Sequence, residues 1–248
     1  MINIYKPIGI SPLDAIKALR EKNHEYKNVP ITYAGRLDPM AEGVLILLAE
    51  DEVHKKGEYI KLDKEYEAEI LFGFETDTYD ILGISQLVQL TGLVEDIKKE
   101  IQNIVGETSL PLPQYSSYKI KGKPLFMWAR EGKLDEIEIP MRTTQIYNAE
   151  FLSSREINEV DLLAEITEKI NLVKGDFRQE EVLENWQEVL NKEDQKYFIV
   201  KAKFNVSSGT YIRSIAYRLG GILLGLTRTK VGNFDIKDSV KIQIDIYP

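Results

Sequence analysis

The stretch from Ala34 to Leu48 reads Ala-Gly-Arg-Leu-Asp-Pro-Met-Ala-Glu-Gly-Val-Leu-Ile-Leu-Leu. Glycine and proline residues bound a short loop that carries one acidic side chain, Asp38. The run from Val44 onward is apolar enough to be a buried strand, which anchors the loop on its far side. We expect this geometry to hold one carboxylate in a cleft, although an Asp before Pro also closes ordinary turns by bonding to its own backbone.

The length and composition of the chain predict a folded protein with a large core. It has 248 residues, 43% of them hydrophobic, and no run of 18 apolar residues or signal-peptide pattern, so we expect a cytoplasmic protein without a membrane partner. Because there is no Cys, disulfides, thiolate metal sites and Cys nucleophiles are excluded. The two His residues lie far apart, which disfavours a zinc site or a Ser-His-Asp triad. Dinucleotide and P-loop motifs are missing as well.

Acidic residues are concentrated in one segment, near residues 155–196. It holds six Lys or Arg and twelve Asp or Glu, a net charge of -6, which leaves -2 of the total of -8 for the rest of the chain. We therefore expect this segment to face away from a polyanion such as RNA. It also predicts two amphipathic helices and looks like an insertion without chemistry, in which Trp186 serves packing. The apolar positions of the first helix are Leu162, Leu163, Ile166 and Ile170, and those of the second are Val182, Trp186, Val189 and Leu190.

The remaining periodic stretches mix strands and helices without a regular β-α-β alternation. This order predicts an α+β fold, a mixed and largely antiparallel sheet flanked by helices. In the strand from residue 64 to 73, Tyr66, Ala68, Ile70 and Phe72 share one face. The other expected strands cover residues 2–5, 44–49, 146–151 and 198–206, and the expected helices cover residues 12–22, 95–105 and 211–219.

Five motifs, in order, resemble the TruB family of pseudouridine synthases. The segment Gly-Arg-Leu-Asp-Pro-x-Ala-x-Gly-Val-Leu around Asp38 resembles the catalytic motif of that family. The others are Lys-Pro-x-Gly from residue 6, Lys-x-Tyr-x-Ala followed by Thr-Asp-Thr-x-Asp-x-x-Gly from residue 64, Ser-x-Gly-Thr-Tyr-Ile-Arg-Ser from residue 207, and Leu-x-Arg-x-x-x-Gly-x-Phe from residue 226. The resemblance implies a pseudouridine synthase-like fold.

The resemblance also implies catalytic roles for Asp38, Tyr66 and Arg213. Asp38 would be the essential residue, Tyr66 would stack on the target base, and Arg213 would pair with Asp38. From the residues alone, Tyr66 is better explained as a core or edge aromatic and Arg213 as a solvated cation. However, Arg213 falls in the first turn of a helix, where a cation is unfavourable and calls for a neighbouring anion.

Basic and aromatic residues alternate near residues 114–133, the thumb segment. From composition, the segment fits an RNA-binding surface or an ordinary hairpin followed by a helix with Phe126 and Trp128 partly buried. The resemblance favours an RNA-gripping thumb. Tyr33 stands where the family often has His. The candidate substrate and RNA contacts are Tyr33, Arg36, Lys119, Lys121, Arg130 and Leu226.

The implied reaction is isomerisation of uridine to pseudouridine, and the expected target is uridine 55 in the T loop of tRNA. It needs no metal or organic cofactor, and Asp38 would act as nucleophile or as the base that starts elimination. The short calcium-like run from Thr76 to Asp80 lacks the spacing and the distal Glu of an EF-hand, so we expect no metal there. The partner is tRNA or another structured RNA; no obligate protein partner is implied, and we expect a monomer.

Three rival hypotheses remain at this stage: a non-catalytic RNA-binding or tRNA-folding protein, a synthase acting on another RNA, and a member of the RNA-guided branch. The chain ends fourteen residues after the last motif, so we expect one catalytic domain over residues 1–248 without a PUA domain. It also has Leu110-Pro111-Leu112-Pro113 where the family has Gln-x-Pro-Pro. These departures bear on the choice of RNA more than on the reaction.

Overall fold

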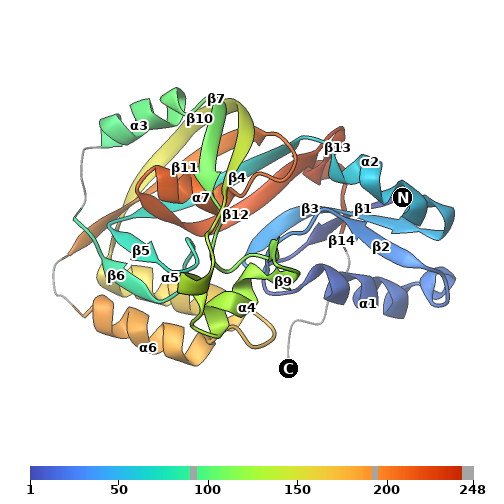
Figure 1. Ribbon diagram of the computed structural model, residues 1–248, viewed down its shortest axis with the longest axis horizontal. Coiled ribbons are helices and arrows are strands. Elements are labelled where there is room, and N and C mark those ends of the chain that lie inside the picture. Colours follow the sequence, from blue (N-terminus) through green and yellow to red (C-terminus); the bar gives the residue numbers. More distant parts are fainter. Residues whose placement is uncertain (90–93, 192–194, 242–248) are drawn as a thin grey trace.

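A mixed ten-stranded sheet forms the centre of the protein (Figure 1), in a computed structural model that describes residues 1–89, 94–191 and 195–241. The strand order is β14-β1-β3-β12-β4-β11-β10-β7, with β2 paired to β3 and β13 to β12. Among the described pairings only β1 with β14 and β3 with β12 are parallel, which confirms a largely antiparallel sheet. The strands are β1 Ile2–Lys6, β2 Ile31–Ala34, β3 Ala41–Ala49, β4 Lys64–Phe72, β7 Gly106–Pro111, β10 Met141–Asn158, β11 Lys196–Val206, β12 Gly221–Val231, β13 Phe234–Asp235 and β14 Val240–Lys241.

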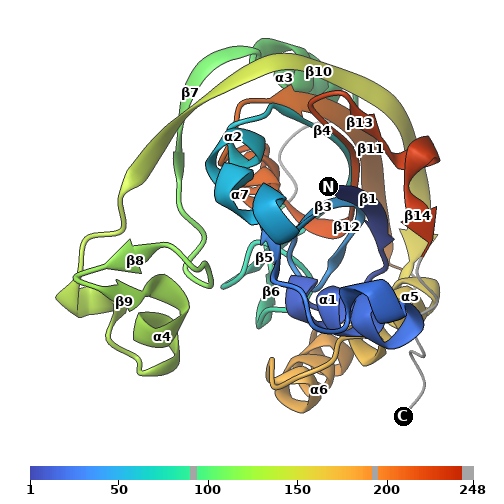
Figure 2. The same cartoon turned by 90° about the vertical axis from the view of Figure 1, so that its right-hand side faces the viewer.

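Helices cover both faces of this sheet, and in Figure 2 the sheet curves around α7. The residues of α3 and α7 pack on the face of β4 that carries Tyr66, Ala68, Ile70 and Phe72, as expected. On the opposite face α5 and α6 pack against Leu71 and its neighbours. The helices are α1 Pro12–Lys22, α2 Lys56–Ile60, α3 Val94–Asn103, α4 Leu125–Arg130, α5 Glu159–Asn171, α6 Gln179–Val189 and α7 Ile212–Arg218, with 3-10 helices at His24–Tyr26, Glu50–Lys55, Leu134–Glu136 and Ile236–Asp238. None of the helices in the described ranges is long and apolar enough to cross a membrane.

Strand β3, which follows the Asp38 loop, is buried on both faces. Leu45 and Leu47 pack with α1 and β1, whereas Val44 and Ile46 pack in a second cluster with Val231 of β12. A strand that is buried on both sides needs a continuous apolar run rather than an alternating one. The run after residue 43 therefore anchors the loop as expected.

Most expected elements are confirmed, but β10 is far longer than expected. The helix at residues 12–22 has the predicted capping box, in which the side chains of Ser11 and Asp14 accept from each other's backbone N–H. In contrast, β10 runs over 18 residues rather than over 146–151. Its second half is largely exposed and polar, and its register against β11 shifts at Ile146/Asn148 and Phe151/Ser153. A strand without an apolar alternation gives no signal in the sequence, so the prediction missed it.

The two helices of the acidic segment are confirmed as α5 and α6, with their apolar positions inward. Trp186 is completely buried, and its Nε1–H donates to the Ile81 carbonyl at 2.9 Å. Its ring lies 5.1 Å from that of Phe74. The prediction that Trp186 serves packing is therefore confirmed. The outer limits of the segment were wrong, because Arg155 belongs to β10 and Lys196 to β11.

Two short hairpins complete the fold. Strands β5 Phe74–Thr76 and β6 Ser85–Leu87 flank the turn that carries the Thr-Asp-Thr motif. Strands β8 Lys119–Ile120 and β9 Lys123–Pro124 lead into α4, so the thumb segment is a hairpin followed by a helix. In Figure 2 this segment projects from the body beyond β7 and β10. Phe126 and Trp128 are half-buried, as expected.

Candidate active site

The Asp38 loop connects β2 to β3 and is fixed through its backbone. The N–H of Gly9 donates to the Pro39 carbonyl at 2.8 Å. Gly43, near the start of β3, has φ +107° and lies so close to the Arg228 carbonyl that a Cβ would collide with it. The Asp38 side chain itself remains 41% exposed. The loop therefore holds a rigid backbone and an accessible carboxylate.

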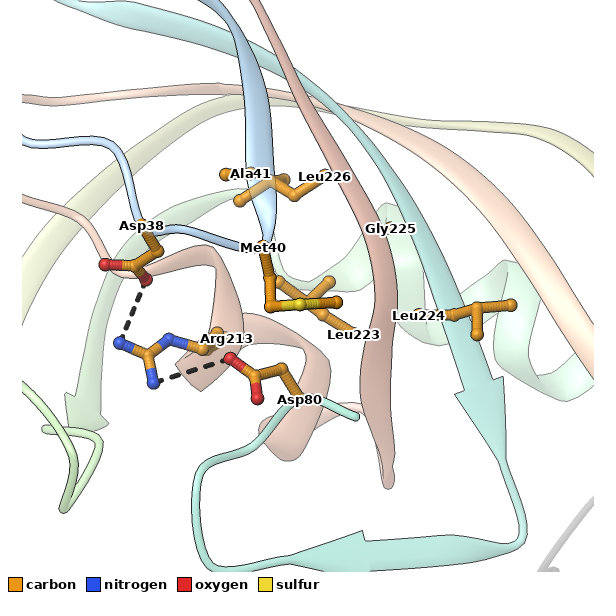
Figure 3. A pocket seen from close by; sticks show the side chains of 9 residues that line it. All are labelled: Asp38, Met40, Ala41, Asp80, Arg213, Leu223, Leu224, Gly225 and Leu226. Carbon is orange, nitrogen blue, oxygen red and sulfur yellow. Dashed lines mark ion pairs between the residues drawn. The ribbon is translucent and has the colours of Figure 1, made fainter. Parts of the chain in front are cut away.

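Arg213, in the first turn of α7, faces this carboxylate from the far end of the chain. Its Nη2 lies 2.9 Å from Asp38 Oδ2, and its Nη1 lies 3.6 Å from Asp80 Oδ2 (Figure 3). The guanidinium also donates to two backbone carbonyls, from Nη1 to Thr78 at 3.0 Å and from Nη2 to Tyr115 at 3.3 Å. The expected ion pair between Asp38 and Arg213 is thus present, and the arginine is held from several sides.

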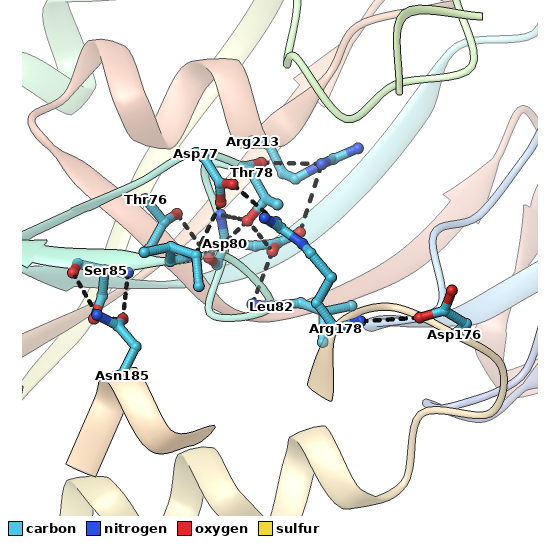
Figure 4. A network of polar contacts seen from close by, with 11 residues as sticks. Thr76, Asp77, Thr78, Asp80, Leu82, Ser85, Asp176, Arg178, Asn185 and Arg213 are labelled. Atoms are coloured by element: carbon cyan, nitrogen blue, oxygen red, sulfur yellow. Dashed lines mark hydrogen bonds and ion pairs between the residues drawn. The ribbon is translucent and has the colours of Figure 1, made fainter. Parts of the chain in front are cut away.

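The electrostatics of this cluster depend on deep burial. Burial alone lowers the pKa of Arg213, but Asp38 and then Asp80 raise it above its ordinary value. Burial raises the pKa of Asp80, although Arg213 and the Thr78 hydroxyl oppose that shift. Asp80 Oδ1 accepts from Thr78 Oγ1 at 2.7 Å and from the Leu82 N–H at 3.0 Å (Figure 4). Arg213 is therefore a permanent cation between two acids.

The larger cavity beside the ion pair has a volume of about 470 Å³. Asp38 and Arg213 line it together with Tyr66 of β4 and Leu226 of β12. Tyr66 is only 7% exposed, because most of its ring packs in the core. A cavity of this size, with an apolar wall and a charged pair, suits a planar ligand such as a nucleobase.

The other charged residues of this lining are all cations. Arg228 is completely buried; its Nε donates to the Val44 carbonyl at 2.8 Å and its Nη1 to the Arg36 carbonyl at 3.0 Å. Burial, and then Arg228, lower the pKa of Lys64 to about 8. Such a lining attracts an anionic ligand. The lining cations apart from Arg213 are Arg36, Lys56, Lys64, Arg142 and Arg228.

A second cavity, of about 390 Å³, lies on the other side of the same ion pair. Arg130 and Phe126 of the thumb segment line it, as does the 176–178 loop that precedes α6. The expectation that the acidic segment faces away from the site was therefore wrong for this loop. Net charge is a property of the whole segment, whereas Asp176, Phe177 and Arg178 lie in the loop between α5 and α6, which packs beside the N-terminal segment through the bond from the Lys174 N–H to the Gly9 carbonyl.

The other predicted residues divide into two groups. Tyr33 and Arg36 line both cavities, with Lys56 Nζ 5.0 Å from the centre of the Tyr33 ring. Lys119 and Lys121 lie exposed on the β8–β9 hairpin and are not among the residues that line the two cavities. The RNA contacts of both groups remain predictions, as do the catalytic roles of Asp38, Tyr66 and Arg213.

Asp80 was not predicted as a site residue. The sequence did contain a signal, since Asp80 belongs to the Thr-Asp-Thr-x-Asp motif, where the carboxylates had been weighed only as a calcium loop. The structure brings Asp80 to Arg213 because β5 and β6 turn back beside β12, where Asp80 forms a bridge with Leu223. Long-range pairing of this kind is not visible in local spacing.

The amino-acid sequence is similar to one family model and to curated proteins. A sequence model described as "TruB family pseudouridylate synthase (N terminal domain)" matches residues 23–177. Two proteins named tRNA pseudouridine synthase B are each 31% identical to the chain. The alignment with the protein from Clostridium tetani covers 98% of this chain and 71% of that protein. The alignment with the protein from Endomicrobium trichonymphae covers 96% of this chain and 87% of that protein.

Solved structures share the fold at low sequence identity. A crystal structure of a Cbf5-Nop10-Gar1 complex matches with a TM-score of 0.59 at 18% identity, and covers 97% of this chain. A structure of an H/ACA RNP bound to a substrate RNA containing 2′-deoxyuridine matches with a TM-score of 0.56 at 17% identity and the same coverage. The chain spans about half the length of each matched chain, 51% and 50%. These likenesses concern the fold.

Proposed function

The chain belongs to the TruB family of pseudouridylate synthases, and from this premise we propose that it converts a uridine of tRNA, uridine 55 of the T loop, to pseudouridine. The RNA is chosen on the names of the relatives, which are tRNA pseudouridine synthases. The observation that carries the proposal is the Asp38–Arg213 pair, 2.9 Å apart in a cavity that Tyr66 also lines.

The reaction is an isomerisation, so its atoms balance without a co-reactant. The N1–C1′ glycosidic bond breaks, the uracil turns within the cavity, and its C5 forms the new bond to C1′. The proton that C5 carried leaves to a base, and N1 gains a proton. Tyr66 is our candidate for the group that accepts the proton from C5.

Asp38 starts this sequence. Arg213 holds its Oδ2, and in Figure 3 the other oxygen points away from the guanidinium. One oxygen is thus oriented by a charge-assisted bond while the other is left for chemistry at the ribose. Nucleophilic attack and proton abstraction by Asp38 both fit this arrangement.

The target base must leave its stack to reach the cavity, at a cost of a few kcal/mol. Stacking on Tyr66 and phosphate contacts with the lining cations would offset that cost. We assign Arg36 and Tyr33, at the mouth of both cavities, to support of the opened RNA loop. The thumb segment would close over the RNA backbone, with Arg130 facing the site.

The test is tritium release from C5-labelled uridine in a tRNA transcript. Wild-type protein should release tritium, and Asp38→Asn should lower the rate by about 10³-fold or more, since loss of a reacting group has effects of that size. Asp51→Asn, which removes an exposed carboxylate from the 3-10 helix after β3, serves as the matched control and should keep the rate.

A transcript with cytidine in place of uridine 55 identifies the position. It should release no tritium if uridine 55 is the target. Wild-type protein that is inactive on every tRNA would refute the enzymatic proposal and leave a tRNA-binding or tRNA-folding role. Full activity of Asp38→Asn would refute the site assignment alone.

A further inference from the structure

Arg178 is a charged residue outside every motif of the family resemblance, yet it reaches the site. It precedes α6 and has a backbone φ of +62°. Its Nη2 lies 2.8 Å from Asp77 Oδ2 (Figure 4), and its guanidinium carbon lies 4.4 Å from the centre of the Tyr115 ring. The ion pair is only partly exposed, at 23% for Arg178 and 28% for Asp77. One side chain therefore joins the β5–β6 turn to the base of the thumb segment.

These two partners lie at the backbone carbonyls that bind Arg213: one partner precedes the first carbonyl, and the other carries the second. Asp77 directly precedes Thr78, whose carbonyl accepts from Arg213 Nη1 at 3.0 Å. Tyr115 accepts from Nη2 through its own carbonyl at 3.3 Å. Arg178 thus connects two segments that are distant in sequence at the places where they contact the arginine paired with Asp38.

Three hydrogen bonds fix the backbone at Arg178 and in the loop around it. The Arg178 carbonyl accepts from the N–H of Val182, in the first turn of α6, at 2.9 Å. Gln179 Nε2 donates to the Val173 carbonyl at 3.0 Å, and the Lys174 N–H donates to the Gly9 carbonyl at 2.8 Å, which fixes the loop against the N-terminal segment. A left-handed backbone is unfavourable for a residue with a side chain, and it persists only where the surroundings determine it.

We propose that Arg178 is a positioning residue for the reaction: through Asp77 and Tyr115 it fixes the two carbonyls that orient Arg213, and hence Asp38. This inference rests on the proposed function. Direct contact of Arg178 with RNA phosphate is less well supported, because Asp77 occupies one edge of the guanidinium and Tyr115 covers its face. The acidic segment then contributes to catalysis without touching the substrate.

The test compares Arg178→Gln with Arg155→Gln, a matched substitution whose partly exposed ion pair with Glu165 joins β10 to α5. Single-turnover rates are measured at saturating protein, and the Kd for the tRNA transcript is measured separately. Arg178→Gln should lower the saturating rate by about 10- to 100-fold, since small misplacement of a catalytic group has effects of this size, and leave Kd unchanged. Arg178→Lys, which restores the ion pair but not the stacking, should recover part of the rate.

Other roles would give other results. A phosphate contact would raise Kd and leave the saturating rate as in wild type. A purely structural role would lower the reacting fraction but not the rate constant. Either result overturns the proposal, as does a rate of Arg178→Gln equal to that of Arg155→Gln.

A double-mutant cycle adds an independent readout. Asp77→Asn should lower the rate, and Arg178→Gln in that background should lower it little further, because both changes break the same ion pair. Additive losses would contradict the proposal. Hydrogen exchange of the free protein should rise around Thr78 and Tyr115 in Arg178→Gln, and unchanged exchange there would also contradict it. That measurement needs no activity, so it separates this inference from the proposed function, which fails only if wild type is inactive.

Discussion

At the scale of single residues, Lys6 places an ionisable amine in the buried interior of the protein. The side chain is completely buried, and its Nζ donates to the carbonyls of Pro7 and Ile10, each at 2.8 Å. Burial lowers the pKa of Lys6 from 10.5 to about 7, and the carboxylate of Asp38 opposes this only in part. The amine therefore fixes the turn that precedes α1 at an electrostatic cost.

This cost predicts how stability depends on pH. Between about pH 7 and pH 10.5 unfolded Lys6 binds a proton that folded Lys6 has released, so the free energy of unfolding should rise with pH across that window. The contribution of one group is at most about 1.4 kcal/mol per pH unit. Below pH 7 both states are protonated, and the cost is fully present. Urea unfolding of wild type and Lys6→Met from pH 6 to 10 checks this.

The difference in unfolding free energy between wild type and Lys6→Met separates the effect of Lys6 from that of Lys64. The pKa of Lys64, about 8, produces a similar but smaller pH dependence in both proteins. The wild-type curve should climb more steeply above pH 7 than that of Lys6→Met. Parallel curves would show that the buried amine keeps its ordinary pKa.

At the scale of elements, the turn between β5 and β6 brings three polar side chains of one motif together. Asp77 accepts from the Ile84 N–H at 2.9 Å, and Thr78 Oγ1 donates to Asp80 Oδ1 at 2.7 Å. Gly83 lies under them, and a Cβ there would collide with Asp77 Oδ1 and Thr78 Oγ1. The glycine of the motif is thus required by packing and not by its backbone angle.

Gly83→Ala should therefore destabilise the protein and slow the reaction. Forcing extra volume into a packed site costs about 1–3 kcal/mol, and the shift of Thr78 would disturb its carbonyl bond to Arg213. Gly57→Ala, in α2 with nothing within 4 Å of the new methyl group, should instead stabilise by about 0.5–1 kcal/mol. Urea unfolding and single-turnover rates measure both effects. Equal stability of the two variants would contradict this account of the motif.

Sequence patterns predicted the elements whose burial is periodic. Strands β4 and β11 alternate, and α1 has a cap, so each was predictable from local spacing. The second half of β10 was not, since its side chains are exposed and its pairing with β11 is set by backbone hydrogen bonds. The meeting of Asp38 with Arg213 followed from the motifs. The bonds from Arg213 to the carbonyls of Thr78 and Tyr115 could not be predicted, because a backbone acceptor has no signature in the sequence.

At the scale of the whole molecule, a chain of net charge -8 has a cluster of cations at the candidate site. Five lysines and arginines besides Arg213 line the larger cavity, and Lys119 and Lys121 extend the positive charge onto the thumb segment. Helices α5 and α6, in contrast, carry eight acidic side chains, most of them exposed. Local charge, and not net charge, then governs the binding of RNA.

Lys119→Gln with Lys121→Gln should weaken tRNA binding and flatten its dependence on salt. Each phosphate contact contributes about 0.7–0.9 to the slope of log K against log salt, so removal of two should reduce the slope by about 1–2. Lys98→Gln with Lys99→Gln, on the exposed side of α3, is the control and should leave the slope as it is. Filter binding from low to moderate salt measures both. Identical slopes for the two variants would exclude the hairpin from the RNA interface.

The position of β12 in the sheet has a consequence for synthesis. It lies between β3 and β4, which follow each other in sequence but do not pair with one another. A ribosome releases those two strands long before β12, so the nascent chain carries two open strand edges and an Asp38 without its Arg213. We expect the enzyme to acquire its fold and its chemistry together, only when the last part of the chain has been translated.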